Sequence, residues 1–242
     1  MTASTWIIPS ALWLAWAGAC RLLENNPRGD GFSGAVWYLN ILYCRIFHRL
    51  RVTGAENIPR DAHPGTLVVV CNHTAGIDPL LVAAAVPFFV RWMMGLDMML
   101  DRFRGFWEWA EIVAVNRRGR DMAGTREAVR HLERGGVLGV FPEGGLERPA
   151  NRFRRFHEGV GFMIARTHAP VLPVWIRGTP QVDPAWASLW RPGRAELTFG
   201  PVMDFAERNL APAEITREIQ AWFERVSGWP AERTSLDDST HA

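Results

Sequence analysis

The stretch that decides the fold is residues 66–79, which read Thr-Leu-Val-Val-Val-Cys-Asn-His-Thr-Ala-Gly-Ile-Asp-Pro. Its first six residues form an apolar run, which is typical of a strand buried on both faces of a sheet. Asp78 and Pro79 predict the start of a helix over residues 79–85, with Asp78 as its N-cap. The loop between them would lie at the carboxyl end of the strand, where α/β proteins bind ligands.

The rest of the chain after residue 50 continues this alternation of short apolar runs and longer amphipathic stretches. Further strands are expected at residues 88–92, 112–115, 137–141, 171–176 and 195–199. Further helices are expected at residues 121–134, 159–167 and 212–226. We therefore predict an α/β domain over residues 51–229, with a mixed, mostly parallel sheet flanked by helices, and a loose tail over residues 230–242.

The composition of the 242 residues is that of an ordinary globular protein, 48% hydrophobic and 21% charged, which excludes a disordered chain or a collagen-like fibre. The formal net charge of +2 favours no class of partner, so nucleic-acid binding is not indicated. All 27 basic residues are arginine, and the lack of lysine excludes Schiff-base chemistry and a P-loop.

The three cysteines, Cys20, Cys44 and Cys71, lack the C-x-x-C spacing, which argues against a disulfide framework or zinc knuckle and favours a reducing compartment. No metal site is expected, because the seven histidines are scattered. Cys20 follows a small-residue triplet that resembles a lipoprotein cleavage site. No positive charge precedes it, so we expect the N-terminus to be retained.

The N-terminal segment suggests contact with a membrane. Residues 6–20 carry no charge, but 15 helical residues reach only about 22 Å, short of the roughly 30 Å hydrocarbon core. Its three tryptophans are typical of the headgroup zone. A second apolar segment, residues 36–50, follows a turn-forming stretch at 25–31.

We expect residues 1–50 to form a helical hairpin that rests on or enters one leaflet, which would make the protein monotopic and membrane-associated, on the cytoplasmic face. The alternative is that both helices simply pack on the globular domain.

His73 and Asp78 are the first candidates for chemistry. A regular helix would place them about 140° apart, but a loop turning at Gly76 could bring the carboxylate against the imidazole. An aspartate bonded to one ring nitrogen fixes the tautomer and raises the basicity of the other nitrogen, which makes His73 a candidate general base. Taken alone, the pair could equally be a solvated loop histidine beside an N-cap.

Three other expected strands could also contribute residues to a site around His73. Residues 112–115 run into an arginine cluster at 116–120, and residues 137–141 run into Pro-Glu-Gly-Gly at 142–145. Residues 171–174 would add an apolar wall. The carboxyl ends of parallel strands share one edge of a sheet, so these groups are expected near His73.

With these residues in place, the sequence resembles the glycerolipid acyltransferases, the family of 1-acyl-sn-glycerol-3-phosphate acyltransferase. Four blocks agree in order and spacing over roughly residues 51 to 200. The family's N-H-x4-D (HX4D) block is matched at Asn72, His73 and Asp78, its strand-ending arginine at Arg117, its F-P-E-G-T-R-S block at Phe141, Pro142, Glu143 and Gly144, and its apolar block at Val171 to Pro173.

The resemblance implies that His73 takes the proton from an acceptor hydroxyl as that oxygen attacks an acyl thioester, with Asp78 orienting the ring. No serine or cysteine nucleophile is needed, and Cys71 is expected to be a buried core thiol. Arg117 would bind the acceptor phosphate. The further substrate contacts implied or expected are Asn72, Glu143, Gly144, Gly145 and Pro173. For Glu143 a bracing role in the loop is the alternative, and for the two glycines a tight turn.

The third block departs from the family pattern, because Gly145 and Leu146 stand where threonine and arginine are usual. The later Phe-His-Glu-Gly at 156–159 also lacks a basic residue often found there. Nearby arginines that could compensate are Arg148, Arg152, Arg154 and Arg155. These departures leave the proposed His73–Asp78 chemistry intact, but they put the identity of the acceptor in doubt.

The function expected from the resemblance is transfer of a fatty acyl group from acyl-CoA or an acyl carrier protein to a lysophosphatidate-type acceptor, in phospholipid biosynthesis and without a cofactor. Alternatives are the same chemistry on glycerol phosphate, a lyso-ornithine lipid or another lysophospholipid. A non-catalytic lipid-binding relative remains a further alternative.

Overall fold

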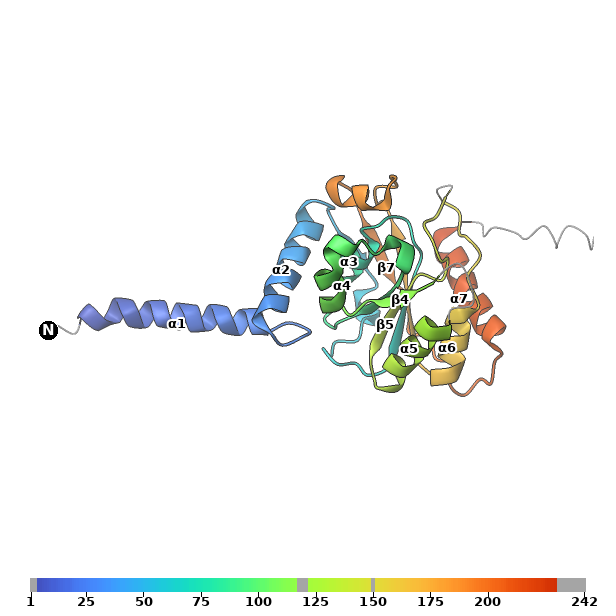
Figure 1. Cartoon of the computed structure of the whole chain (residues 1–242), viewed down its shortest axis with the longest axis horizontal. Coiled ribbons are helices and arrows are strands. Elements are labelled where there is room, and N and C mark those ends of the chain that lie inside the picture. Colours follow the sequence, from blue (N-terminus) through green and yellow to red (C-terminus); the bar gives the residue numbers. More distant parts are fainter. Residues whose placement is uncertain (1–3, 117–121, 149–150, 230–242) are drawn as a thin grey trace, which may run out of the picture.

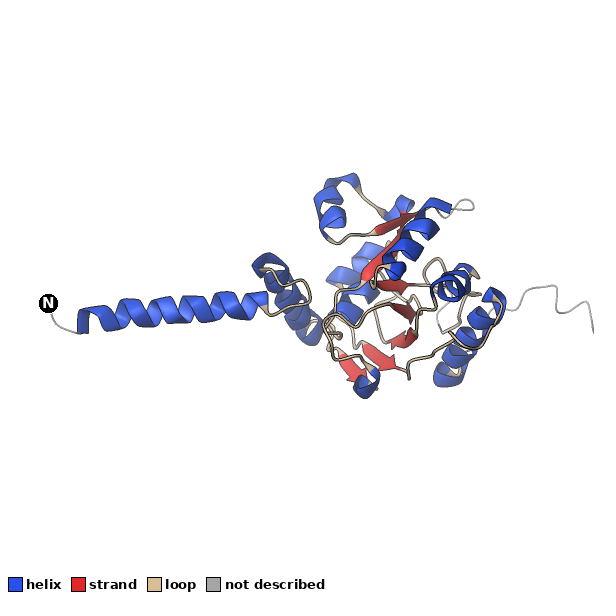
Figure 2. Ribbon diagram, turned by 90° about the horizontal axis from the view of Figure 1, so that it is seen from below, coloured by secondary structure: helices blue, strands red, loops and turns tan. Residues whose placement is uncertain are grey.

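The computed structural model describes residues 4–116, 122–148 and 151–229 (Figure 1). The tail expected at residues 230–242 lies outside them. The remainder forms a body of strands covered by helices, from which one long helix leads away (Figures 1 and 2).

A seven-stranded sheet runs through the body in the order β1-β7-β6-β2-β5-β3-β4. Its neighbouring strands pair in parallel except β6 and β7, which are antiparallel. The strands are β1 (Arg51–Thr53), β2 (Leu67–Cys71), β3 (Arg91–Gly95), β4 (Val113–Val115), β5 (Val137–Val140), β6 (Val171–Arg177) and β7 (Glu196–Phe199). The predicted mixed, mostly parallel sheet is confirmed.

Helices α2, α3 and α4 lie on one side of this sheet and α5, α6 and α7 on the other, whereas α1 leads away from the body (Figure 1). The α-helices are α1 (Ser4–Glu24), α2 (Gly31–Ile46), α3 (Asp78–Ala83), α4 (Arg104–Trp109), α5 (Met122–Glu133), α6 (Gly159–Thr167) and α7 (Pro212–Ser227). Short 3₁₀ turns are η1 (Ala55–Asn57), η2 (Leu96–Met98), η3 (Asp101–Phe103) and η4 (Ala185–Trp190).

Strand β2 shows why the chain needs helices on both faces. Val68 and Val70 point into a core shared with α5, α6 and α7, whereas Val69 and Cys71 point into a second core shared with α3. Successive side chains of a strand alternate between faces, so an unbroken apolar run requires two apolar coverings. Cys71 is fully buried, as predicted for a core thiol.

Four elements differ from the sequence-based expectation. Strand β3 begins at Arg91 rather than residue 88, because Phe88 and Val90 are buried in the approach to the strand and do not pair in the sheet. Helix α4 and strand β1 were not predicted. Asp78 is the first residue of α3 and not its N-cap, which is Ile77.

The predicted N-terminal helix pair is present, and α1 is longer than expected, at 21 residues. Asp30 caps α2 by accepting a hydrogen bond from the backbone N–H of Ser33. At Gly34 the helices touch: an added Cβ there would lie 1.7 Å from the carbonyl oxygen of Leu23. Among the described residues, no helix combines the length and apolarity needed to cross a membrane.

Helix α2 joins the pair to the body through side-chain hydrogen bonds. Trp37 donates to the carbonyl of Ala83, and Asn40 donates to the carbonyl of Leu80. Both acceptors belong to α3, the helix that follows the His73 loop.

Candidate active site

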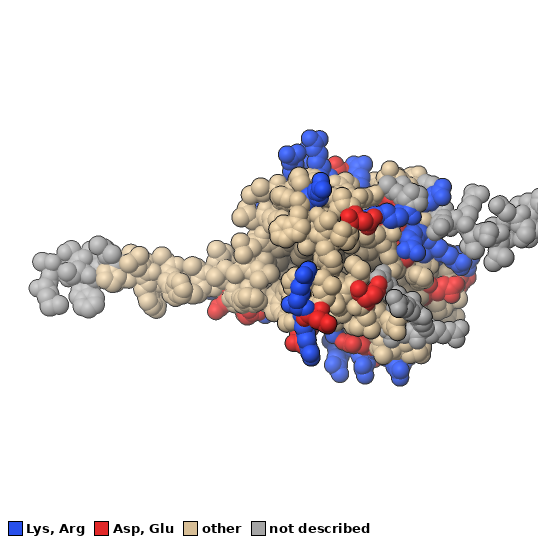
Figure 3. Space-filling view, turned by 45° about the horizontal axis from the view of Figure 1, so that its top comes forward, with Lys and Arg blue, Asp and Glu red and all other residues tan. Residues whose placement is uncertain are grey.

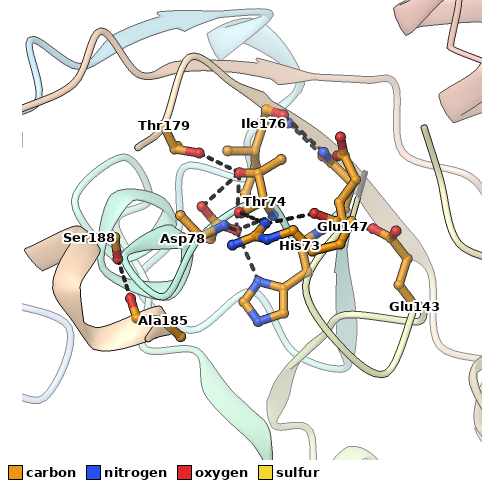
Figure 4. Close-up of polar contacts among 12 residues, drawn as sticks. His73, Thr74, Asp78, Glu143, Glu147, Ile176, Thr179, Ala185 and Ser188 are labelled. Carbon is orange, nitrogen blue, oxygen red and sulfur yellow. Dashed lines mark hydrogen bonds and ion pairs between the residues drawn. The ribbon is translucent and has the colours of Figure 1, made fainter. Parts of the chain in front are cut away.

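The loops that follow β2 and β5 build the centre of the site (Figure 4). The two strands pair in parallel with Val70 opposite Val140, so the chain leaves both strands at the same edge of the sheet. His73 and the Phe141–Leu146 turn are therefore neighbours, although about 70 residues separate them in the sequence.

The loop places His73 against Asp78, with the imidazole Nδ1 3.0 Å from the carboxylate Oδ2. The turn at Gly76 allows this, because an added Cβ there would lie 2.5 Å from the carbonyl oxygen of Ala185. The predicted pairing of imidazole and carboxylate is thus present. With Nδ1 donating to Asp78, Nε2 carries the free lone pair of the neutral ring.

Asp78 is fully buried, and its carboxylate is held by the loop that it closes. It accepts hydrogen bonds from the backbone N–H groups of Thr74 (2.7 Å) and Ala75 (2.9 Å) and from the Thr74 hydroxyl (3.1 Å). The Thr74 hydroxyl is in turn 2.6 Å from that of Thr179, beyond the end of β6. These bonds satisfy a buried charge and fix the carboxylate in place.

Glu143 braces the loop from the other side (Figure 4). Its two carboxylate oxygens accept hydrogen bonds from the backbone N–H groups of His73 (2.8 Å) and Arg154 (2.9 Å). Burial raises the pKa of Glu143 to about 8, against the opposite influence of these two N–H groups. Of the two roles considered for Glu143, the structure displays the bracing contacts.

Asn72 has a different place from the one expected of a substrate ligand. Its amide nitrogen donates to the carbonyl of Ile176 (2.9 Å), and its amide oxygen accepts from the Ile176 N–H (2.7 Å). The residue is fully buried, so it ties the end of β2 to β6 and supports the loop from below.

Pro173 is likewise a correction to the expected substrate contacts. It lies buried within β6, opposite Val70 of β2, and its carbonyl accepts the N–H of Gly200. It belongs to the sheet beneath the site, because the fourth block forms the middle of a strand rather than its end.

The two glycines of the third block line the site. Gly144 has a φ of +65°, and its N–H donates to the carbonyl of Phe141, which closes a tight turn. That N–H is therefore used within the turn, which is the alternative considered for this glycine. Gly145 and Leu146 follow at the cavity wall.

Arg117, the expected phosphate ligand, lies outside the described residues. The preceding Asn116 lines the same cavity as His73. Of the other candidate cations, Arg148 is engaged elsewhere, with hydrogen bonds to the carbonyls of Thr74 and Glu147 and an ion pair with Asp183. Arg155 lies 3.9 Å from Glu158.

Of the four arginines that could compensate, Arg154 lines the cavity; Arg28, before α2, also lines it and is paired with Glu111. Arg154 is exposed, and its backbone is fixed by Glu143, the same carboxylate that holds the backbone of His73. Glu143 therefore links a cation and the candidate base on one wall of the cavity.

The cavity beside His73 has a volume of about 1230 Å³. Its walls include the turn before α2, helices α2, α3, α4 and α6, strand β3, the turn after β5 and the segment 183–186. Most of the lining side chains are apolar, and five are tryptophans: Trp37, Trp92, Trp107, Trp109 and Trp186. The cavity wall also holds two histidines, His73 and His157. A largely apolar, aromatic cavity with a candidate base at its wall suits a hydrocarbon chain that ends in a reactive group.

Several of these contacts carry no signal in the sequence. The partners of Asn72, Thr74 and Glu143 lie 104, 105 and 11 residues further along the chain. The aromatic walls could have been suspected only from the count of 12 tryptophans. Among the described residues, no group of three or more His, Cys, Asp or Glu side chains could hold a metal ion.

The fold is similar to a crystal structure of the 1-acyl-sn-glycerophosphate (LPA) acyltransferase PlsC from Thermotoga maritima. The TM-score is 0.65, over 80% of this chain and 78% of that one, at 23% sequence identity, a level at which the likeness concerns the fold alone.

In sequence, the chain is 34% identical to uncharacterized proteins from Mycobacterium bovis and from two strains of Mycobacterium tuberculosis, over 76% of its own length. It spans 55% of the length of these relatives. The family model described as Acyltransferase matches residues 49–177, more than half of the chain and the whole His73 loop, and the chain therefore belongs to the acyltransferase family.

Proposed function

We propose that this chain is an O-acyltransferase that moves a fatty acyl group from a thioester, acyl-CoA or acyl carrier protein, to the hydroxyl of a lysophosphatidate-type acceptor at a membrane surface. The observation that carries the proposal is the His73–Asp78 pair, 3.0 Å apart, at the wall of a largely apolar cavity of about 1230 Å³.

The chemistry follows from the fixed tautomer. His73 Nε2 accepts the proton of the acceptor hydroxyl while that oxygen attacks the thioester carbonyl carbon. The C–O bond forms and the C–S bond breaks, and the imidazolium returns the proton to the leaving thiolate. Asp78, buried and held by three loop hydrogen bonds, stabilises the imidazolium between these two transfers.

The acceptor's anionic group would be held beside His73 by arginine. Arg117 stays our first candidate from the sequence, and Arg154 is the alternative because it lines the cavity. A guanidinium fork offers a phosphate two parallel hydrogen bonds, which would orient the hydroxyl toward the imidazole.

Membrane contact is proposed from the exposed apolar surface of the helix pair. The large apolar side chains exposed on α1 and α2 are Leu12, Trp13, Leu14, Trp16, Leu22, Phe32, Leu39, Leu42 and Ile46. In Figure 3 charged side chains are scattered over the body, whereas few are seen on the described part of this pair. A continuous apolar surface with tryptophan favours a monotopic position in one leaflet.

A second acceptor class is favoured by one observation. Leu146 lines the cavity where the family usually has arginine, and the next arginine, Arg148, is engaged by the backbone and Asp183. Glycerol phosphate, a lyso-ornithine lipid or another lysophospholipid would then replace lysophosphatidate.

The test is an acyl-transfer assay of the full chain against a panel of these acceptors, with acyl-CoA and acyl carrier protein as donors. His73→Ala should lower turnover by at least about 10²-fold, the scale of general-base loss. The His73 side chain is only 20% exposed and stacks on Phe141, so the melting temperature of His73→Ala is measured to separate lost chemistry from lost stability. Near-native turnover in His73→Ala would contradict the proposal, and normal lipid binding without any transfer would favour a binding protein.

A further inference from the structure

Three aromatic rings form a column at the site, one from each of three adjacent strands. The His73 ring stacks on Phe141 with centroids 4.1 Å apart and planes 20° from parallel. Phe141 stacks on Trp92 at 4.9 Å and 15°. His73 follows β2, Phe141 follows β5 and Trp92 lies in β3, and these strands are neighbours in the sheet.

The sheet makes room for this column at Gly139. Trp92 lies opposite Gly139 in the pairing of β3 with β5, and a Cβ on Gly139 would lie 2.5 Å from the indole ring. Glycine weakens a strand interior, and here the indole takes the space of the missing side chain. Trp92 is 7% exposed, so its ring is held against both Gly139 and Phe141.

A base in this position needs more than its bond to Asp78. One hydrogen bond at Nδ1 fixes one corner of the imidazole but leaves the tilt of its plane free, and the tilt decides where Nε2 points. Stacking against a fixed ring removes this freedom. An aromatic face also attracts a cation, so it favours the imidazolium that forms during transfer.

We propose that Phe141, backed by Trp92, is a positioning residue for His73, which sets the plane of the imidazole and stabilises its protonated form. The inference rests on the proposed function for its catalytic consequence. The column itself is independent of that function, and its first test is therefore spectroscopic.

The spectroscopic test uses the full chain with isotope-labelled histidine. The His73 Cε1–H resonance, identified by its absence in His73→Gln, should be displaced upfield by the ring current of Phe141. Phe141→Leu should abolish the displacement and Phe141→Tyr should keep it. A resonance that Phe141→Leu leaves in place would overturn the stacking.

The kinetic test separates positioning from substrate binding. Phe141→Leu should lower kcat about 10-fold and change KM less than about 2-fold, because an oriented base acts on the transition state. Phe141→Tyr should restore most of kcat. Phe162→Leu, at an exposed phenylalanine of α6, is the matched control and should leave kcat unchanged. Equal losses in Phe141→Leu and Phe141→Tyr would overturn the role of the ring.

The part played by Trp92 is tested through Gly139. Gly139→Ala should displace the indole, shift the His73 resonance and lower kcat, whereas in a Trp92→Leu background the same change should add little. An unshifted resonance in Gly139→Ala would overturn the backing role. A chain with the expected spectra but no acyl transfer would refute the proposed function and leave the column standing.

Discussion

At the residue scale, the site is built from short polar side chains whose partners are backbone groups. Asp78, Glu143 and Asn72 each take at least two hydrogen bonds that involve main-chain atoms. Such bonds hold the backbone of the loop and not only one side-chain rotamer. The side chains proposed to bind the acceptor, Arg117 and Arg154, are tested by the variants below.

Arg117→Ala tests the phosphate ligand that the sequence predicts. A charge-assisted bidentate contact is worth roughly 1.5–3 kcal/mol, so KM for a phosphate-bearing acceptor should rise about 10- to 100-fold. Arg117→Lys should rescue only in part, because lysine lacks the fork. An acceptor without that phosphate should hardly respond.

Arg154→Ala is the matched comparison, since Arg154 lines the cavity. KM is measured for both acceptor types in both variants. Arg154 is the phosphate ligand if Arg117→Ala leaves KM unchanged for both acceptors and Arg154→Ala raises KM only for the acceptor that carries the phosphate. Equal effects on both acceptors would mean that the altered arginine is structural.

At the element scale, the sequence predicts those helices and strands that have a long apolar or amphipathic period. Strand β2, helix α6 and helix α7 were found within one residue of their predicted bounds because each has a clear pattern. Strand β1 has three exposed residues and so has no burial pattern to read. Helix α4 has only six residues, is rich in aromatic side chains and contains a glycine near its start, so it has no clear helical pattern in the sequence.

The same limit holds for the site. His73 and Glu143 could be predicted because they lie just beyond apolar runs, and Asp78 because it precedes Pro79 at an expected helix start. Their supports could not, because Ile176, Thr179 and Trp92 come from other strands and loops that only the strand order brings near. Asn72 and Pro173 show the same limit, since motif position does not indicate that Asn72 binds the backbone of β6 or that Pro173 lies within that strand.

Helix α1 carries a prediction of its own. Trp13 and Trp16 are 67% and 71% exposed, so changing both to serine removes apolar surface without disturbing a core. The double variant should bind vesicles of anionic and zwitterionic lipid several-fold more weakly and keep its melting temperature. Phe162→Ser, on the body, is the control. Equal sedimentation of the double variant and the native chain would remove the anchoring role of α1.

At the scale of the whole molecule, the buried carboxyls link the site to stability. Glu143 and Glu147 are almost fully buried in adjoining turns, and burial raises the pKa of both, that of Glu143 to about 8. His48 and His131 act in the opposite sense, because burial lowers their pKa. The pH dependence of the native chain's unfolding free energy therefore combines opposite contributions from these groups. The contribution of Glu143 has to be measured by comparison with a variant.

Glu143→Gln isolates the contribution of Glu143 to the pH dependence of stability. The folded chain holds the Glu143 proton more tightly than the unfolded chain, whose carboxyl has a pKa near 4.5. The stabilisation is complete below about pH 4.5 and is lost as the pH rises to about 8, by a few kcal/mol. The native chain should therefore lose its advantage over Glu143→Gln steadily between pH 5 and pH 8. Urea unfolding across this range measures the difference, with the exposed Glu207→Gln as control. A difference that stays constant with pH would mean that Glu143 is ionised throughout, held so by the N–H groups of His73 and Arg154.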